Sequence, residues 1–137
     1  MSEIVRFTID TPPRTKKNHQ QIRFNKKTGR RFVSQSDAYK AFHAAAMMLI
    51  PEEARLGIDS PVNVQALYYM PTRRVVDLVN LHEALHDVLK DAGVVADDNS
   101  RIIAATDGSR VLYDKERPRT EVIITSMGDE KGGTIQN

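Results

Sequence analysis

The sequence predicts a single domain of the α+β class, in which two main helices pack on a small mixed or antiparallel sheet. With 137 residues, of which 40% are hydrophobic, the chain is long enough to bury one core. Short segments of alternating apolar and polar residues, typical of strands, occur near both ends and in the middle. Two longer segments have apolar residues at helical spacing. The order of strand, hairpin, helix, strand, helix and strands is typical of helices packed on one sheet.

The first thirty residues predict a strand and then a hairpin. Residues 3–10 alternate in the manner of a strand, and Pro12 and Pro13 follow its end. Residues 23–33 contain two short runs around a turn that includes Gly29, which is typical of a hairpin.

The middle of the chain predicts a helix followed by a strand. Ser36 and Asp37 offer an N-cap, and Pro51 stops the helix. The apolar residues at positions 39, 42, 46 and 50 lie on one helical face. Residues 61–69 alternate again and predict a strand.

The second helix is predicted to begin at Asp77 and to end at Gly93, a natural C-terminal cap. Strands are expected over residues 101–106, 110–113 and 120–126, and residues 128–137 are expected to form a flexible tail. The buried stripe of the helix comprises Leu78, Leu81, Leu85, Val88 and Ala92.

Composition and charge restrict the function more weakly than the motifs do. The chain has no cysteine, which is compatible with the cytoplasm and excludes thiolate metal sites. It has no apolar run that predicts export or a membrane span. The net charge is only +2, but residues 14–31 contain eight Lys and Arg residues and no acid. Such a run attracts polyanions, or it is simply a solvated basic loop.

Three acids flank the second helix. Asp77 stands at its start, and Asp97 and Asp98 follow its predicted end. Asp77 alone is explained by helix capping, and the adjacent pair by a turn. If the three carboxylates converge, they form the oxygen-rich site that Mg²⁺ prefers. A metal site of this kind in a chain with basic clusters indicates chemistry on a phosphodiester.

A competing motif lies inside the same helix. His82, Glu83 and His86 match the H-E-x-x-H pattern of zinc hydrolases, in which two imidazoles hold zinc and the glutamate is a general base. A third protein ligand is needed, and no histidine follows His86. An acid such as Asp107 would have to serve. Histidines on the shoulder of a buried stripe are also common packing residues.

The stretch 77–98 resembles the core of the RusA-type Holliday-junction resolvases, whose pattern is approximately D-x-D-N-L, a lysine, D-A-L, a glycine and D-D. The Pro12-Pro13 loop and the Pro71 lead-in to a basic pair also resemble that family, so the similarity spans residues 4–126. The matching positions in the core are Asp77, Asn80, Leu81, Asp87, Leu89, Gly93, Asp97 and Asp98.

The resemblance implies a RusA-like endonuclease domain over residues 1–127. It also implies a homodimeric, Mg²⁺-dependent endodeoxyribonuclease of phage or prophage origin that resolves branched DNA in recombination and repair. Mn²⁺ is a possible substitute for Mg²⁺. On this basis Asp77, Asp97 and Asp98 are the predicted catalytic metal ligands, and Asn80 positions the site. The residues expected to bind DNA are Lys16, Lys17, Asn18, Arg73 and Arg74.

Two positions depart from the family pattern. Val79 stands where the family has its second catalytic aspartate, and Glu83 where it has a lysine. Because Glu83 is one helical turn beyond Val79, we expect it to replace the missing carboxylate as a catalytic metal ligand. The alternative is a solvated Glu83 in a protein that binds junctions without cutting them.

Overall fold

The computed structural model describes residues 2–16, 21–34 and 37–127. It confirms the predicted α+β class, with two α-helices and a mixed sheet in one small domain. The predicted tail 128–137 and the predicted helix cap Ser36 lie outside the described residues. In chain order the elements are β1 (Glu3–Ile9), β2 (Gln21–Asn25), β3 (Arg30–Ser34), α1 (Asp37–Leu49), the 3₁₀ turn η2 (Glu52–Ala54), β4 (Val62–Met70), α2 (Leu78–Asp91), β5 (Ile103–Ala105), β6 (Arg110–Tyr113) and β7 (Arg119–Ser126).

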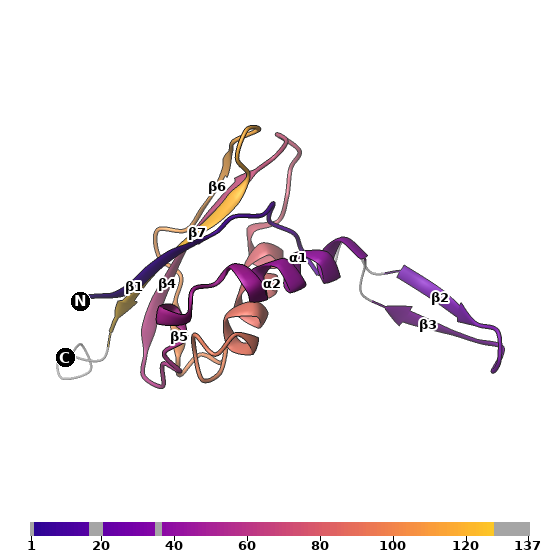
Figure 1. Ribbon diagram of the computed structural model, residues 1–137, viewed down its shortest axis with the longest axis horizontal. Coiled ribbons are helices and arrows are strands. Elements are labelled where there is room, and N and C mark those ends of the chain that lie inside the picture. The colour runs from indigo at the N-terminus through magenta and orange to yellow at the C-terminus, as the bar shows by residue number, and fades with distance from the viewer. Residues whose placement is uncertain (1, 17–20, 35–36, 128–137) are drawn as a thin grey trace.

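The main sheet is organised around β4 (Figure 1). On one side β4 pairs antiparallel with β7, which pairs antiparallel with β1. On the other side it pairs parallel with β5 near its start and with β6 near its end. Alternate β4 residues, from Val62 through Val64 and Ala66 to Tyr68, are at most 1% exposed. The period of two in the sequence therefore places one face of the central strand in the core.

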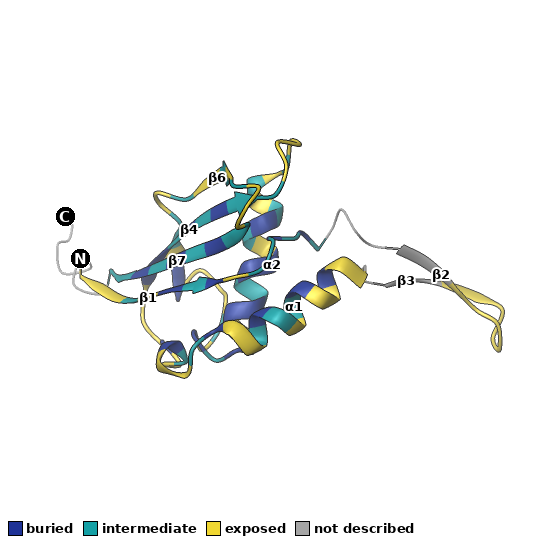
Figure 2. Ribbon diagram, turned by 45° about the horizontal axis from the view of Figure 1, so that its top comes forward, coloured by how far each residue is buried: buried dark blue, intermediate teal, exposed yellow. Residues whose placement is uncertain are grey.

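The two helices cover that face and are joined to it by a single hydrophobic core (Figure 2). α2 buries Leu81, Ala84, Leu85, Val88 and Leu89. This stripe is close to the predicted one, and each fully buried leucine contributes about 1.5–3 kcal/mol relative to an exposed one. No helix in the described ranges has the length and apolar character needed to cross a membrane.

The β2–β3 hairpin stands away from this core in both ribbon views (Figures 1 and 2). Its two strands pair antiparallel, with Asn25 opposite Arg30. Gly29 has a φ of 70°, a conformation that favours glycine. The predicted hairpin is therefore present, although it packs on no face of the main sheet.

Candidate functional site

The first turn of α2 is capped by an exposed acid. Oδ1 of Asp77 accepts a hydrogen bond from the Val79 N–H at 2.9 Å, and the Asp77 backbone adopts an extended conformation typical of an N-cap. Oδ2 of Asp77 has no hydrogen-bond partner in the part of the chain that the structure describes. Asp77 therefore caps the helix with one oxygen and leaves the other available to a cation.

The adjacent acids Asp97 and Asp98 lie beyond the other end of α2. The backbone N–H of Asp98 donates to Oδ1 of Asp97 at 2.7 Å, and Asn99 Nδ2 donates to Oδ2 at 3.3 Å. These contacts lower the pKa of Asp97, with the Asp98 N–H as the largest cause and the charge of Lys90 contributing. Both carboxylate oxygens of Asp97 therefore have partners that favour the ionised form.

Backbone hydrogen bonds keep the loop that carries this pair at the C-terminal end of α2. The Gly57 N–H donates to the Gly93 carbonyl, and the Ile58 N–H donates to the Val94 carbonyl. The Ala96 N–H donates to the Ile58 carbonyl. The loop is thereby tied to the segment before β4 and does not fold back along the helix.

The acids at the two ends of α2 are consequently far apart within one chain. α2 has 14 residues, which corresponds to about 20 Å at ~1.5 Å per residue. Lys90, in the last turn, has its Nζ 3.9 Å from Oδ1 of Asp97. Oxygen atoms that share one Mg²⁺ must each lie about 2.1 Å from it. The predicted convergence of Asp77 with Asp97 and Asp98 inside a single chain is therefore wrong.

Glu83 and Asn80 lie between the two ends of α2. Glu83 is exposed. The pKa of Tyr39 is raised by burial, by its hydrogen bond to Asp87 and, among smaller causes, by the charge of Glu83. Glu83 is one helical turn before Asp87, the residue that bonds Tyr39 of α1. Asn80 is half-buried, and Val79 in the first turn is 70% exposed.

One group of potential metal ligands is found in the described ranges, and it was not predicted. His43, Asp87 and Asp91 each have a ligand atom within 4.8 Å of the others. His43 Nε2 is 2.8 Å from Oδ2 of Asp91, and the Tyr39 hydroxyl donates to Oδ2 of Asp87 at 2.6 Å. These bonds join α1 to α2. Because His43 and Asp91 are 48 positions apart, no local sequence pattern could have indicated the pair.

The two histidines of the H-E-x-x-H motif pack against the sheet. The Tyr68 hydroxyl lies 2.7 Å from Nδ1 of His82, and the His82 and His86 rings stack with centroids 5.4 Å apart. Burial, followed by the neighbouring His82, lowers the pKa of His86 to about 4. No acid or histidine in the described ranges completes a three-ligand group with them. Asp107 is hydrogen-bonded to Asn63 near the other end of β4. The alternative of a zinc hydrolase therefore has no structural support.

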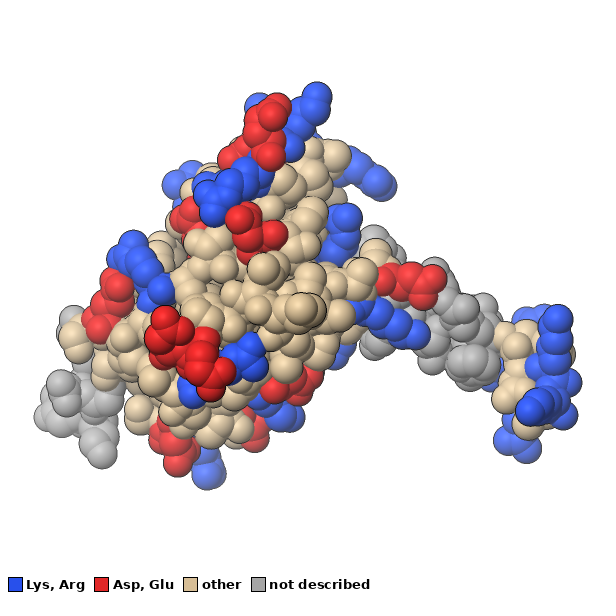
Figure 3. All heavy atoms as spheres, in the orientation of Figure 1, with Lys and Arg blue, Asp and Glu red and all other residues tan. Residues whose placement is uncertain are grey.

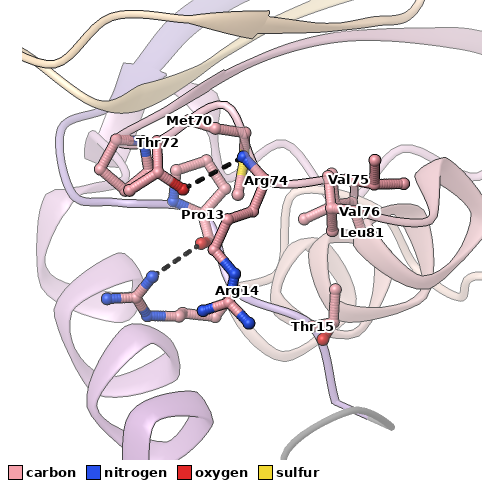
Figure 4. A pocket seen from close by; sticks show the side chains of 10 residues that line it. Pro13, Arg14, Thr15, Met70, Thr72, Arg74, Val75, Val76 and Leu81 are labelled. Atoms are coloured by element: carbon pink, nitrogen blue, oxygen red, sulfur yellow. Dashed lines mark hydrogen bonds between the residues drawn. The ribbon is translucent and has the colours of Figure 1, made fainter.

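A cleft of about 410 Å³ opens beside the start of α2 (Figure 4). The side chain of Arg74 extends toward the segment that carries Arg14 and Thr15. Thr15 is 2% exposed and its Oγ1 has no hydrogen-bond partner among the described residues. Both charged residues in the lining are arginines, so the cleft suits an anion. The complete lining is Pro13, Arg14, Thr15, Met70, Pro71, Thr72, Arg74, Val75, Val76 and Leu81.

The residues predicted to bind DNA occupy different surroundings. Arg74 lines the cleft, whereas the exposed Arg73 lies over the Tyr113 ring, with Cζ 4.0 Å from its centroid. Lys16 Nζ is 3.8 Å from Oδ2 of Asp87. Lys17 and Asn18 lie outside the described residues. Arg14, which was not among the predicted contacts, lines the cleft with Arg74. The sequence feature that could have indicated Arg14 as a contact is its position in the basic run 14–31.

Comparison with known protein families places the chain in context. The sequence model of a protein family described as Endodeoxyribonuclease RusA matches residues 10–125. The matched range includes the cleft, both ends of α2 and the whole central strand. No curated protein sequence matches the chain.

Proposed function

Because the chain belongs to the RusA endodeoxyribonuclease family, we propose that it resolves Holliday junctions and related branched DNA by metal-dependent hydrolysis. The observation that carries the proposal is the placement of acids at the two ends of α2, with a cleft lined by two arginines beside the Asp77 end. Recombination and repair in the cytoplasm are the processes in which such an activity is expected.

The chemistry of the acids fits a hard divalent cation. Asp77 keeps one carboxylate oxygen free of partners in the described structure, and the hydrogen bonds to Asp97 favour its carboxylate form. Asp98 is exposed. Carboxylate oxygens are the ligands that Mg²⁺ and Mn²⁺ take in proteins. We therefore assign metal binding to Asp77, Asp97 and Asp98. When bound, the cation activates water and neutralises charge on the leaving oxygen.

A homodimer reconciles this assignment with the length of α2. In one chain the acids are separated by the whole helix, but a two-fold axis near the middle of α2 reverses the direction of the partner helix. Asp77 of each chain then faces the Asp97–Asp98 pair of the other. The same symmetry gives two equivalent sites, as paired cuts in opposed strands require.

The cleft beside Asp77 is assigned to the DNA backbone. Arg14 and Arg74 supply charge that matches a phosphate, and the buried Thr15 hydroxyl has an unused hydrogen-bonding capacity among the described groups. Contacts of this kind position a strand without reading its bases. Selectivity for a junction then comes from the shape of the DNA.

Glu83 is the fourth acid that we propose for the site. Val79 is exposed on the first turn, where an aspartate would point away from the core. Glu83 lies one turn further along α2. We retain Glu83 as a proposed replacement ligand, and the alternative is a member of the family that binds junctions without cutting them.

Cleavage of a labelled four-way junction tests the proposal. We expect wild-type protein to cut with Mg²⁺ or Mn²⁺ and to stop when a chelator is added, and Asp98→Asn to bind the junction without cutting. Undiminished cutting by Asp98→Asn would show that Asp98 is not a metal ligand of the site. Salt-sensitive binding without cleavage under any divalent metal would identify the binding-only alternative.

A further inference from the structure

The tip of the β2–β3 hairpin concentrates positive charge without compensation. Lys26, Lys27, Arg30 and Arg31 are all exposed, and Figure 3 shows the far end of the hairpin covered by basic side chains. No acid occurs between residues 14 and 31. None of the four cations forms an ion pair with a described residue.

Some of the arginines on the body of the protein are paired with acids. Arg6 pairs with Glu3, Arg117 with Asp10, and Arg119 with Asp114, at 2.6 to 3.2 Å. These three pairs neutralise part of the positive charge on the body. At the hairpin tip, four like charges lie close together with no described acid beside them, so the tip attracts an external anion.

Local hydrogen bonds fix the tip in shape. Oδ1 of Asn25 accepts from the backbone N–H of Lys27 at 2.9 Å and of Thr28 at 3.3 Å. The Gly29 N–H donates to the Asn25 carbonyl at 2.8 Å, and the Arg30 N–H donates to the Thr28 hydroxyl at 3.3 Å. The turn is closed by backbone and polar groups alone, so the four charged side chains are free to contact a ligand.

The dimensions of the hairpin suit a DNA duplex. Each strand has five residues, which corresponds to roughly 17 Å at ~3.4 Å per residue. A two-stranded ribbon fits the major groove of B-DNA, in which each strand presents one phosphate per ~3.4 Å of helix axis. The exposed Phe24, opposite Arg31, adds an apolar surface suited to deoxyribose.

We infer that the β2–β3 hairpin is an arm that grips the phosphate backbone of a duplex segment through Lys26, Lys27, Arg30 and Arg31. This deepens the proposed function and rests on it for the identity of the polyanion. Because backbone contacts carry no information about sequence or branching, the arm adds affinity for any duplex. The preference for junctions belongs to the rest of the protein.

Fluorescence anisotropy measures the affinity of the protein for a linear duplex and for a four-way junction over a range of salt concentrations. A chelator is present so that no DNA is cleaved during the measurement. The test variant replaces all four cations, as Lys26→Gln, Lys27→Gln, Arg30→Gln and Arg31→Gln. The matched control exchanges them while keeping the charge, as Lys26→Arg, Lys27→Arg, Arg30→Lys and Arg31→Lys. Because the turn is closed by Asn25, Thr28 and Gly29, neither variant removes a bond that shapes it.

We expect the neutral variant to bind both DNAs roughly tenfold or more weakly at low salt. Its slope of log K against log salt should fall by ~0.9 for each phosphate that the arm no longer neutralises, up to about 3.6. The junction-to-duplex ratio should stay constant, and the charge-keeping control should match wild type. An unchanged slope overturns the inference, and so does a weakening confined to the junction.

The two proposals fail in different ways. Wild-type protein that never cuts a junction, but loses salt-dependent duplex binding in the neutral variant, refutes the nuclease and keeps the arm. Wild-type protein that cuts the junction, with unchanged binding by the neutral variant, refutes the arm alone. Wild-type protein that binds no DNA refutes both.

Discussion

Asp77 and Asp97 lie at opposite ends of α2, separated by about 20 Å of helix. Asp77 caps the first turn, and Asp97 lies beside Lys90 in the last. Two groups at this distance cannot hold one ion, so a site that uses both must draw them from two chains. If both residues bind the same cation, the separation of Asp77 from Asp97 predicts a site shared between two chains.

Mixing two inactive variants tests for a shared site. Asp77→Asn and Asp98→Asn are each expected to reduce cleavage by roughly a hundredfold or more, because each removes a metal ligand. In a mixed dimer, one shared site carries both substitutions and the other carries neither. Mixing should therefore restore nicking of one strand of a junction. If the mixture is as inactive as its components, the sites are not shared between chains.

Asp77 has a structural role that can be separated from its proposed chemical one. Asn is as good an N-cap as Asp, whereas Ala costs about 1 kcal/mol. Asp77→Asn should therefore leave the free energy of unfolding in urea nearly unchanged, and Asp77→Ala should lower it by about 1 kcal/mol. Both should reduce cleavage by roughly a hundredfold or more. Normal cleavage by Asp77→Asn would show that Asp77 serves only as a helix cap.

Val79 offers a gain-of-function test. Its side chain is 70% exposed in the first turn of α2, where an acid is favoured by the helix dipole. Val79→Asp restores the carboxylate of the family pattern. It should lower the Mg²⁺ concentration for half-maximal cleavage by about tenfold. Val79→Asn, of similar size but without charge, is the control. Equal Mg²⁺ dependence in both variants would exclude a role for position 79.

Glu83→Ala examines the proposed replacement ligand in the same assay. If Glu83 holds the cation, the variant should need roughly tenfold more Mg²⁺ for half-maximal cleavage. Adding Val79→Asp to this variant should return the Mg²⁺ requirement toward the wild-type value. Glu83→Gln keeps the size and removes the charge, so it should resemble Glu83→Ala. A Glu83→Ala protein with normal Mg²⁺ dependence would show that the charge of Glu83 has no catalytic role.

His86 should weaken the fold at acid pH. Burial lowers its folded-state pKa to about 4, below the ~6.5 of an unfolded chain. The unfolded state therefore binds the proton more readily, and stability falls as pH decreases from about 6.5 toward 4. The loss is at most about 3 kcal/mol. Urea unfolding at pH 7.5 and 5 measures it. His86→Leu should show a flatter dependence, and an unchanged dependence would assign the effect to other groups.

Local chemistry explains why the elements could be predicted from sequence. Asp77 and Gly93 mark the ends of α2 through hydrogen bonding and backbone conformation that each residue carries with it. The alternation in β4 likewise follows from its burial on one face. The predicted boundaries of these elements lie close to those in the structure for this reason.

Long-range pairing explains what could not be predicted. The parallel contact of β6 with β4 and the His43–Asp91 bond between the helices depend on tertiary folding. The same holds for the loop after α2. Its backbone bonds to Gly57 and Ile58 keep Asp97 and Asp98 at the far end of the helix, and no pattern in residues 77–98 encodes those partners.

The outer edge of β1 has a consequence for how copies of the chain associate. Among the described strands β1 pairs only with β7, so its other side presents unpaired backbone groups. The exposed Arg6 and Glu3 side chains are on this strand, and joining two β1 strands would bring charged side chains together and strip them of water. Edge-to-edge joining of two sheets through β1 into one extended sheet is thereby disfavoured.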